Sequence, residues 1–285
     1  MNINYSFIIP HKNCPDLLQR CVDSIPERVD VQVIVVDDNS DADKKPALKE
    51  RKNLQVKLLD ASQSKGAGRA RNVGLEHAEG KWLLFADADD YYVVGFLEVL
   101  DKYVEGKAEV IYFNSNFIDG KTGAVLPQLS MQKRISFYDG SQINADKIRL
   151  LNKVPWNKMV LHNLVKEYDI KFEEVPNGND ILFSLRVGYY STSIKVEKQV
   201  LYSYIRTENS ILTSKPSVSG ALCKLEHRVK LNMVFKSLGY PQWTESCLRI
   251  ILMYSVKNGI PFFISFIKHL PLIYKSRKEW VKMLK

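Results

Sequence analysis

Three carboxylates gather in the segment FADADDYY, residues 85–92. Asp87, Asp89 and Asp90 follow directly after the apolar run 82–85, which has the composition of a buried strand. In an extended chain residues i and i+2 point the same way, so Asp87 and Asp89 face one side together. Two carboxylates roughly 5 Å apart repel each other by about 3 kcal/mol at an effective dielectric constant of about 20. A raised pKa or a bound cation relieves such repulsion.

The cation that suits a short cluster of carboxylate oxygens is Mg²⁺ or Mn²⁺. One or two carboxylates hold such an ion while substrate phosphates complete its coordination shell. The alternative is a solvated acidic turn at the start of the next helix, because Asp is common at helix N-caps. Taken alone, the cluster favours neither interpretation.

Strand-like and helix-like segments alternate over the first 118 residues. The expected strands are apolar and β-rich, at 5–10, 31–37, 54–60, 81–87 and 109–115. Helical spacing of apolar residues lies between them, over 17–25 and 70–77. This alternation predicts an α/β fold with a mostly parallel central sheet flanked by helices. Polar residues follow several of these strands, and ligands of open parallel sheets bind at the carboxyl ends, so we expect one shared site there.

The pattern becomes mixed from about residue 119 to residue 215. We expect a hairpin or loop at 118–125, helices at 140–151 and 179–189, a short segment starting near 154, and β-rich runs at 192–196 and 199–205. These segments are interpreted as the second half of one domain, 1–215, that folds over the carboxyl edge of the sheet. Four cysteines without CxxC or matched His spacing are expected to be reduced, structural thiols.

Residues 216–285 are expected to form a separate, basic and helical arm. Residues 223–285 hold 12 of the 41 Lys and Arg residues but only 3 of the 32 Asp and Glu residues, so they carry the whole net charge of +9. The apolar part, 248–274, has no uncharged stretch longer than 258–267, whereas a membrane-spanning helix needs about 20 apolar residues. A transmembrane span is therefore not expected.

A basic, aromatic-rich arm of this kind suits a helix that lies on an anionic membrane surface. One alternative is a helical cap with solvated lysines. Another is nucleic-acid binding, although the sequence shows no recognised nucleic-acid-binding motif beside the positive charge. The start MNINYSFIIP lacks the basic head and cleavage site of a signal peptide. We therefore expect a cytoplasmic protein that is peripheral on the inner face of the plasma membrane and does not bind nucleic acid.

Seven motifs follow one another along about residues 4–212: FIIPHKN, VIVVDDNS, GAGRARNVGLEHAEG, the strand that closes in DADD, VPWNKMVLHNL, IKFEEVPNGNDILFSL and VLYSYIRTENSI. Their order resembles that of the inverting family 2 glycosyltransferases of the GT-A fold. A GT-A fold with a nucleotide-sugar site is what the resemblance implies.

Site residues follow from this resemblance. The nucleotide-sugar site is expected to include Pro10, Lys12, Asn13, Asp38, Arg71, Asn72, Asp87 and Ala88. Within it, Asp38 accepts a hydrogen bond from the base and Asp87 lies towards the ribose. Many family members carry an aromatic residue at the position of Lys12. The resemblance makes Asp89 the direct ligand of Mn²⁺ or Mg²⁺, with Asp90 as a second candidate ligand.

The resemblance makes Asp180 the general base. Single displacement with inversion needs a carboxylate that deprotonates the acceptor hydroxyl. A capping role in the following helix is the alternative for Asp180. Asn179, which stands where Glu is commoner, is expected on the acceptor side of the site. Trp156 is expected either to stack on an acceptor sugar or to pack in the core. Arg206 is expected either to reach the diphosphate or to lie on the surface.

The predicted activity is transfer of a sugar, with inversion, from a nucleotide sugar such as a UDP-sugar to a saccharide or lipid-linked saccharide acceptor. The resemblance implies a role in cell-surface polysaccharide biosynthesis. One alternative is a nucleotidyltransferase, but PHKNCPDLL lacks the glycine-rich loop that such enzymes carry after the first strand. The other is a non-catalytic nucleotide-sugar-binding protein, against which the presence of Asp89, Asp90 and Asp180 together argues.

Overall fold

The computed structural model describes residues 2–175, 177–206, 218–248, 251–256, 259, 262–268 and 271. The chain forms two compact units. Unit 1 comprises Met1–Val175 and Asn179–Glu208, and unit 2 comprises Pro176–Gly178 and Asn209–Lys285. The domain boundary expected between residues 215 and 216 lies outside the described residues.

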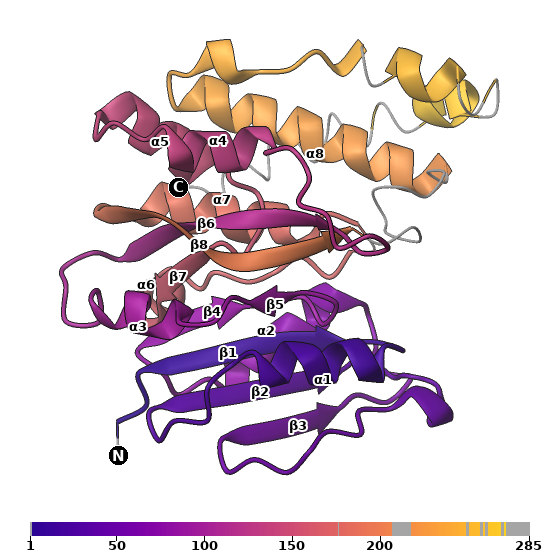
Figure 1. Ribbon diagram of the computed structural model, residues 1–285. Coiled ribbons are helices and arrows are strands. Elements are labelled where there is room, and N and C mark those ends of the chain that lie inside the picture. The colour runs from indigo at the N-terminus through magenta and orange to yellow at the C-terminus, as the bar shows by residue number, and fades with distance from the viewer. Residues whose placement is uncertain are drawn as a thin grey trace. The chain divides into compact units, whose positions relative to one another are not determined.

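An eight-stranded sheet forms the centre of unit 1 (Figure 1). The strands are β1 (Tyr5–His11), β2 (Val31–Asp37), β3 (Leu54–Leu58), β4 (Trp82–Phe85), β5 (Tyr91–Tyr92), β6 (Val110–Asp119), β7 (Lys158–Leu161) and β8 (Ile194–Arg206). Their order across the sheet is β3-β2-β1-β4-β7-β6-β8-β5, and β7 and β5 run antiparallel to their neighbours. The other neighbouring strands are parallel, so the prediction of a mostly parallel α/β sheet is confirmed.

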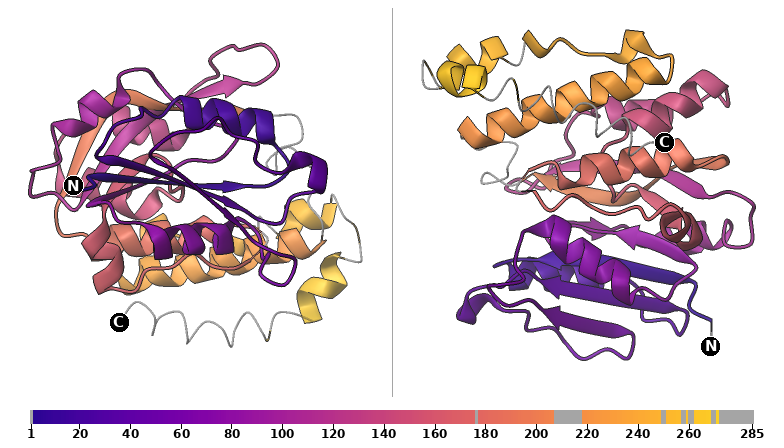
Figure 2. Two further views of the ribbon diagram at one scale, coloured as in Figure 1. Left: turned by 90° about the horizontal axis from the view of Figure 1, so that it is seen from below. Right: turned by 180° about the vertical axis from the view of Figure 1, so that it is seen from behind.

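Helices cover both faces of this sheet. One face carries α1 (Pro15–Asp23) and α3 (Phe96–Asp101), and the other carries α2 (Ala67–His77), α4 (Ser130–Ser136), α5 (Gln142–Leu151), α6 (His162–Glu167) and α7 (Asn179–Tyr190), while the short turn η1 (Ala42–Lys44) follows β2. The left view of Figure 2 shows α1 and α2 on opposite sides of the strands. With both faces covered, β1 and β2 are buried at every position, which explains their continuous apolar runs.

The carboxyl ends of the central parallel strands meet at one edge of the sheet. His11, the last residue of β1, pairs with Asp37, the last residue of β2. On the other side of β1, Ile8 pairs with Phe85, the last residue of β4. The polar residues that follow β1, β2 and β4 therefore start from neighbouring positions, as the alternating pattern predicts.

The second half of unit 1 departs from the predicted elements in two places. Strand β7, part of the short segment expected near residue 154, inserts antiparallel between β4 and β6. The two expected runs at 192–196 and 199–205 form one strand, β8, whose pairing with β6 contains register shifts. The region 118–125 closes as the expected hairpin, with an antiparallel bridge between Ile118 and Val125.

Unit 2 is helical wherever it has regular structure among the described residues. It contains α8 (Val218–Ser237), the turn η2 (Pro241–Trp243) and the helical segments 251–256 and 262–268. Ala221, Tyr254 and Phe262 form its small buried core. In the part of the chain that the structure describes, no helix has the length and apolarity to cross a membrane. All four cysteines are free thiols, as expected.

Candidate active site

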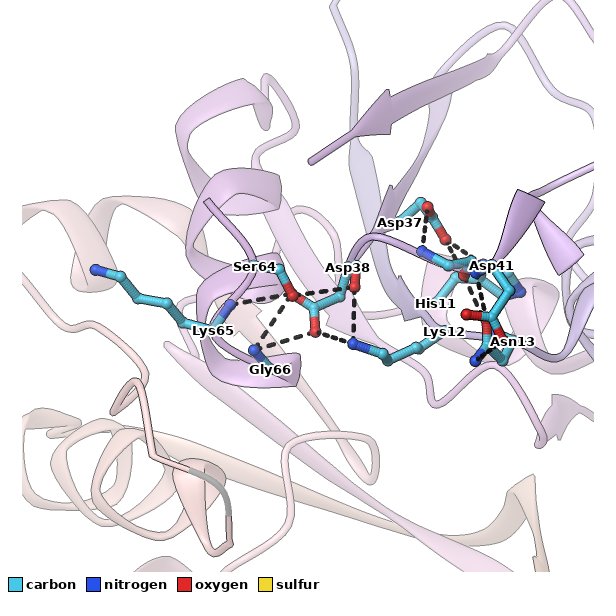
Figure 3. Close-up of polar contacts among 10 residues, drawn as sticks. His11, Lys12, Asn13, Asp37, Asp38, Asp41, Ser64, Lys65 and Gly66 are labelled. Carbon is cyan, nitrogen blue, oxygen red and sulfur yellow. Dashed lines mark hydrogen bonds and ion pairs between the residues drawn. The ribbon is translucent and has the colours of Figure 1, made fainter. Parts of the chain in front are cut away.

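The turn that follows β2 is organised by the buried Asp38. Its backbone N–H donates to the carbonyl of His11, at 2.9 Å. Its carboxylate accepts hydrogen bonds from the backbone N–H groups of Lys65, at 3.2 Å, and Gly66, at 3.1 Å, and lies 3.4 Å from the Lys12 ammonium. Figure 3 shows this carboxylate between Lys12 and the backbone that leads into α2. Gly66 has φ of 88°, a left-handed conformation that favours glycine.

A second network locks β1 against β2 beneath that turn. The backbone N–H of Cys14 donates to His11 Nε2, at 3.1 Å, so His11 carries its proton on Nδ1 and donates it to Asp37 Oδ1, at 2.8 Å. The Ser40 hydroxyl donates to the same Asp37 oxygen at 2.5 Å and accepts from the backbone N–H of Asn13 at 2.9 Å. The His11–Asp37 pair, drawn in Figure 3, joins the ends of β1 and β2. Both side chains are buried, and the pair holds the strand ends in register.

The three predicted residues at the end of β1 lie in different surroundings. Pro10 is buried within the strand. Lys12 is exposed, and its ammonium donates to the Asp38 carbonyl at 3.1 Å. The exposed Asn13 exchanges two hydrogen bonds with Asp41, through its amide nitrogen at 3.0 Å and its amide oxygen at 2.8 Å. Of these three, Lys12 is the one whose charge faces solvent beside Asp38.

Arg71 connects three elements of the candidate site. One guanidinium nitrogen donates to Asn179 Oδ1, at 2.7 Å, and another donates to Asp87 Oδ1, at 2.5 Å. The guanidinium also lies over the Phe172 ring, 5.4 Å from its centroid. Because Arg71 itself is buried in α2, it fixes the end of β4 and the start of α7 relative to each other. We call this set, Arg71 with Asp87 and Asn179, the Arg71 bridge.

The neighbouring Asn72 anchors the segment before α7. Its amide donates to the Phe172 carbonyl at 3.0 Å and accepts from the Phe172 N–H at 2.9 Å. Gly68 permits close packing in the same place, because a Cβ there would lie 2.0 Å from the Glu173 carbonyl oxygen. The structure therefore gives Asn72 a positioning role, and its side chain is engaged by protein backbone.

The acidic cluster separates into carboxylates with different surroundings. Asp87 pairs with Arg71 and is partly exposed, whereas Ala88 is buried. Burial, and then the Asp87 charge, raise the pKa of the partly exposed Asp89 to about 6. The Arg20 side chain, which lies outside the motifs, donates to the Asp89 carbonyl at 2.5 Å. Asp87 and Asp89 are thus the accessible carboxylates of the cluster.

Asp90 is 0% exposed and points into the protein. Its two oxygens accept hydrogen bonds from the Tyr202 hydroxyl and from the Ile205 N–H, both at 2.7 Å. The Tyr202 hydroxyl in turn accepts from the Asp87 N–H at 3.0 Å. Burial raises the pKa of Asp90 well above its usual range. This geometry ties β8 to the acidic cluster and leaves no exposed Asp90 oxygen for the second-ligand role predicted from the motif.

Tyr202 was not predicted as a site residue, although it lies in the Tyr-x-Tyr stretch of the last motif. Its ring is buried and stacks on Trp156, with centroids 4.9 Å apart. Trp156 is 4% exposed and also stacks on Tyr204, which corresponds to the core alternative for this tryptophan. Arg206 pairs with Asp119 at 2.5 Å on the surface, which corresponds to its surface alternative.

The remaining carboxylates fit a divalent cation that shares its shell with a substrate. Among the described residues, no three His, Cys, Asp or Glu side chains gather closely enough to hold an ion by themselves. No described residue other than Asp89 itself donates a hydrogen bond to the Asp89 carboxylate. One carboxylate oxygen of Asp87 accepts a hydrogen bond from Arg71. Mg²⁺ and Mn²⁺ are commonly bound by one or two protein carboxylates together with phosphate oxygens of a substrate.

Asp180 lies in the first turn of α7 and follows Asn179, the α7 residue of the Arg71 bridge. Burial raises the pKa of its carboxyl; Arg71 lowers that pKa and Asp87 raises it further. The residue remains partly exposed. A carboxylate of raised pKa that stays accessible to solvent is suited to take a proton from a hydroxyl group.

Lys158 is a fully buried lysine whose positive charge also lowers the pKa of Asp180. Its ammonium donates to the carbonyls of Asn152, at 3.3 Å, and Val154, at 2.5 Å, and lies 5.4 Å from the Tyr112 ring centroid. Burial lowers the pKa of Lys158 to about 7, against a partly compensating effect of Asp180. This motif lysine therefore supports the loop before β7 from inside the protein.

The lowered pKa predicts how stability depends on pH. Between pH 7 and the ordinary lysine pKa of 10.5, the unfolded chain binds the Lys158 proton and the folded protein does not. The free energy of unfolding therefore rises with pH in this window. In urea titrations, the free energy of unfolding of wild type minus that of Lys158→Met should increase by about 2 kcal/mol from about pH 7 to about pH 9. Lys171→Met, at an exposed lysine, should show no such trend, and a flat difference for Lys158→Met would contradict the assignment.

The family model described as glycosyl transferase family 2 matches residues 6–169. The chain belongs to this family. A glycosyltransferase from Streptococcus pneumoniae, GlyA, is 30% identical over 88% of this chain and 38% of its own length. The poly(ribitol-phosphate) beta-N-acetylglucosaminyltransferase TarS from Staphylococcus aureus is 27% identical over 71% of this chain and 35% of its own length. The matches thus span about a third of the length of these two relatives.

Solved structures share the fold of the family 2 chain. The crystal structure of TarS 1-349 from S. aureus in complex with UDP-GlcNAc has a TM-score of 0.65 and 19% sequence identity, and the match covers 99% of this chain and 82% of that one. The same TarS fragment with UDP gives a TM-score of 0.59 at 22% identity, over 81% of this chain and 65% of that one. The predicted GT-A-like fold is therefore confirmed.

Proposed function

We propose that this family 2 protein is an inverting glycosyltransferase in which Asp180 is the general base. The observation that carries the proposal is the Arg71 bridge, which joins Asp87 of the acidic cluster to Asn179, the neighbour of Asp180. An accessible acid pair and a carboxylate of raised pKa then share one edge of the sheet. Family membership supports transferase chemistry, and this arrangement supplies the groups that it needs.

The reaction is a single displacement at the anomeric carbon of the donor sugar. The acceptor oxygen forms a bond to that carbon while its proton passes to Asp180, and the bond to the leaving diphosphate oxygen breaks with its electron pair on the diphosphate. Asp89, with Asp87 beside it, would hold Mn²⁺ or Mg²⁺. A bound ion of this kind stabilises the negative charge of the leaving diphosphate. Arg71 keeps Asp87 and the start of α7 in place during the exchange.

The donor that we propose is a UDP-sugar, and the acceptor is a saccharide or lipid-linked saccharide used for a cell-surface polysaccharide. The TarS structure contains UDP-GlcNAc, and an Escherichia coli relative, WfaP, is described as a UDP-Glc:alpha-D-GlcNAc-diphosphoundecaprenol beta-1,3-glucosyltransferase. WfaP is 27% identical over 46% of this chain. A lipid-linked acceptor places the reaction at a membrane, and we propose a peripheral location on its cytoplasmic face.

A thermal-shift experiment with UDP and Mn²⁺ tests the donor site. Wild type should gain roughly 5 °C in Tm with UDP and Mn²⁺ together, and little with either alone, because ligand at about a hundred times its Kd adds about 3 kcal/mol of stability. Asp89→Asn should abolish the joint effect, whereas Asp43→Asn, at an exposed aspartate after β2, should retain it. Equal stabilisation of Asp89→Asn and wild type would contradict the metal assignment.

A further inference from the structure

Two helical segments of unit 2 expose apolar side chains on their outer sides. In segment 251–256, Tyr254 is buried in the small core while the exposed residues include Leu252, Met253 and Val256. In segment 262–268, Phe262 is buried on the same core, with its ring centroid 5.8 Å from that of Tyr254. Its exposed residues include Phe263, Ile264 and Ile267. We name these six exposed residues the outer apolar surface.

This surface is unlike the outside of a helical cap with solvated lysines. A cap buries its apolar stripe and turns polar residues to water. Here the inward positions are already filled by Tyr254 and Phe262, and every exposed residue of the two segments except Lys268 is apolar. Val256 is 87% exposed, and it belongs to a group of six large apolar side chains that are exposed on two short segments of one unit. Among the described residues none covers these side chains, and a group of exposed apolar side chains of this kind marks an interaction surface.

The charge of the surrounding sequence selects the partner. Residues 246–278 contain six Lys and Arg residues and no Asp or Glu. Lys268, at the end of the second segment, is exposed beside Ile267. In the sequence these apolar residues are therefore flanked only by positive charge. This combination matches the interface of an anionic bilayer, where apolar groups enter the acyl boundary and lysines reach phosphate groups. A protein partner would meet this excess of positive charge only with an acidic surface.

We infer that the outer apolar surface inserts into the interface of an anionic lipid bilayer. The inference deepens the proposed function, on which it rests for the lipid-linked acceptor, by naming the residues that bring the enzyme to that acceptor. The insertion is interfacial, and its free energy has two contributions, burial of the apolar side chains and attraction of the basic residues to anionic headgroups. We expect that stable binding needs both contributions.

Flotation of the full chain with vesicles tests this inference. Wild type should float with vesicles of phosphatidylcholine mixed with phosphatidylglycerol, and not with phosphatidylcholine alone. Val256→Glu should weaken the partition about tenfold, because an apolar side chain that enters the bilayer interface is replaced by a charge that the headgroups repel. Ile264→Glu should have the same effect. Val29→Glu is the matched control, because Val29 is 78% exposed in unit 1, and it should float like wild type.

Other results would overturn the inference. Equal flotation of Val256→Glu and wild type, or no flotation of wild type with anionic vesicles, would refute it. Conversion of a dimer to a monomer by Val256→Glu, with unchanged flotation, would assign the surface to a second copy of the chain instead. Hydrolysis of UDP-sugars with Mn²⁺ in the absence of vesicles should be the same for all these proteins. Its absence in wild type would count against the proposed function and not against the membrane surface.

Discussion

Asp180→Asn is expected to lower the turnover of UDP-sugar hydrolysis with Mn²⁺ about a thousandfold, because the amide cannot accept the proton of the attacking hydroxyl or water. The side chain keeps its size, and the Arg71 bridge holds the start of α7 through Asn179, so the donor site should remain intact. Affinity for UDP with Mn²⁺, measured by calorimetry, should stay within about twofold of wild type. A loss confined to turnover identifies a group that acts in the chemical step.

The matched control for this variant is Asp169→Asn, an exposed carboxylate that pairs with Lys171. It should hydrolyse the donor like wild type. Turnover of Asp180→Asn equal to that of the control would refute the base assignment. A parallel loss of UDP affinity would instead mean that Asp180 supports the donor site. A wild-type protein that binds UDP but hydrolyses no donor would fit the non-catalytic alternative.

Asp90→Ala is expected to lower the free energy of unfolding by about 3 kcal/mol. The change leaves the Tyr202 hydroxyl and the Ile205 N–H without their acceptor in a fully buried place, and each unsatisfied donor costs about 1–3 kcal/mol. Relief of the buried charge offsets part of this loss. Asp90→Asn keeps one carbonyl oxygen and should lose less. Urea denaturation of the protein without added ligands measures both effects.

Asp43→Ala, at an exposed position of η1, should change the free energy of unfolding by less than about 0.5 kcal/mol. If Asp90 were a metal ligand and not an anchor of β8, its removal would leave the ligand-free protein at wild-type stability and abolish only the stabilisation by Mn²⁺ with UDP. That pattern is the opposite of the one expected here. The two roles of neighbouring Asp89 and Asp90 are thus separable by experiment.

The central strands could be predicted from the sequence because their burial leaves a simple pattern. Both faces of β1 and β2 are covered, so their residues form continuous apolar runs that end in polar residues. Strand β7 has only four residues, and β5 has two, so neither carries enough of a pattern to reveal its pairing. Their places in the sheet depend on long-range packing.

The candidate site was predictable as a set of positions, but the direction of each side chain was not. Spacing places Asp89 and Asp90 next to each other, yet Asp89 is partly exposed whereas Asp90 is buried and accepts hydrogen bonds from β8, more than a hundred residues later. Asn72 likewise finds its partner in the Phe172 backbone. A motif fixes residue identity, whereas orientation is decided by contacts that are distant in sequence.

One buried guanidinium has a consequence for how such an enzyme can change. Arg71 holds Asp87 with one nitrogen and Asn179 with another, and these two residues neighbour the proposed metal ligand Asp89 and the proposed general base Asp180. Under the proposed mechanism, a substitution that shifts α2 would move both neighbours by the same motion. The distance between the leaving diphosphate and the proton acceptor would then be preserved for as long as Arg71 keeps both hydrogen bonds.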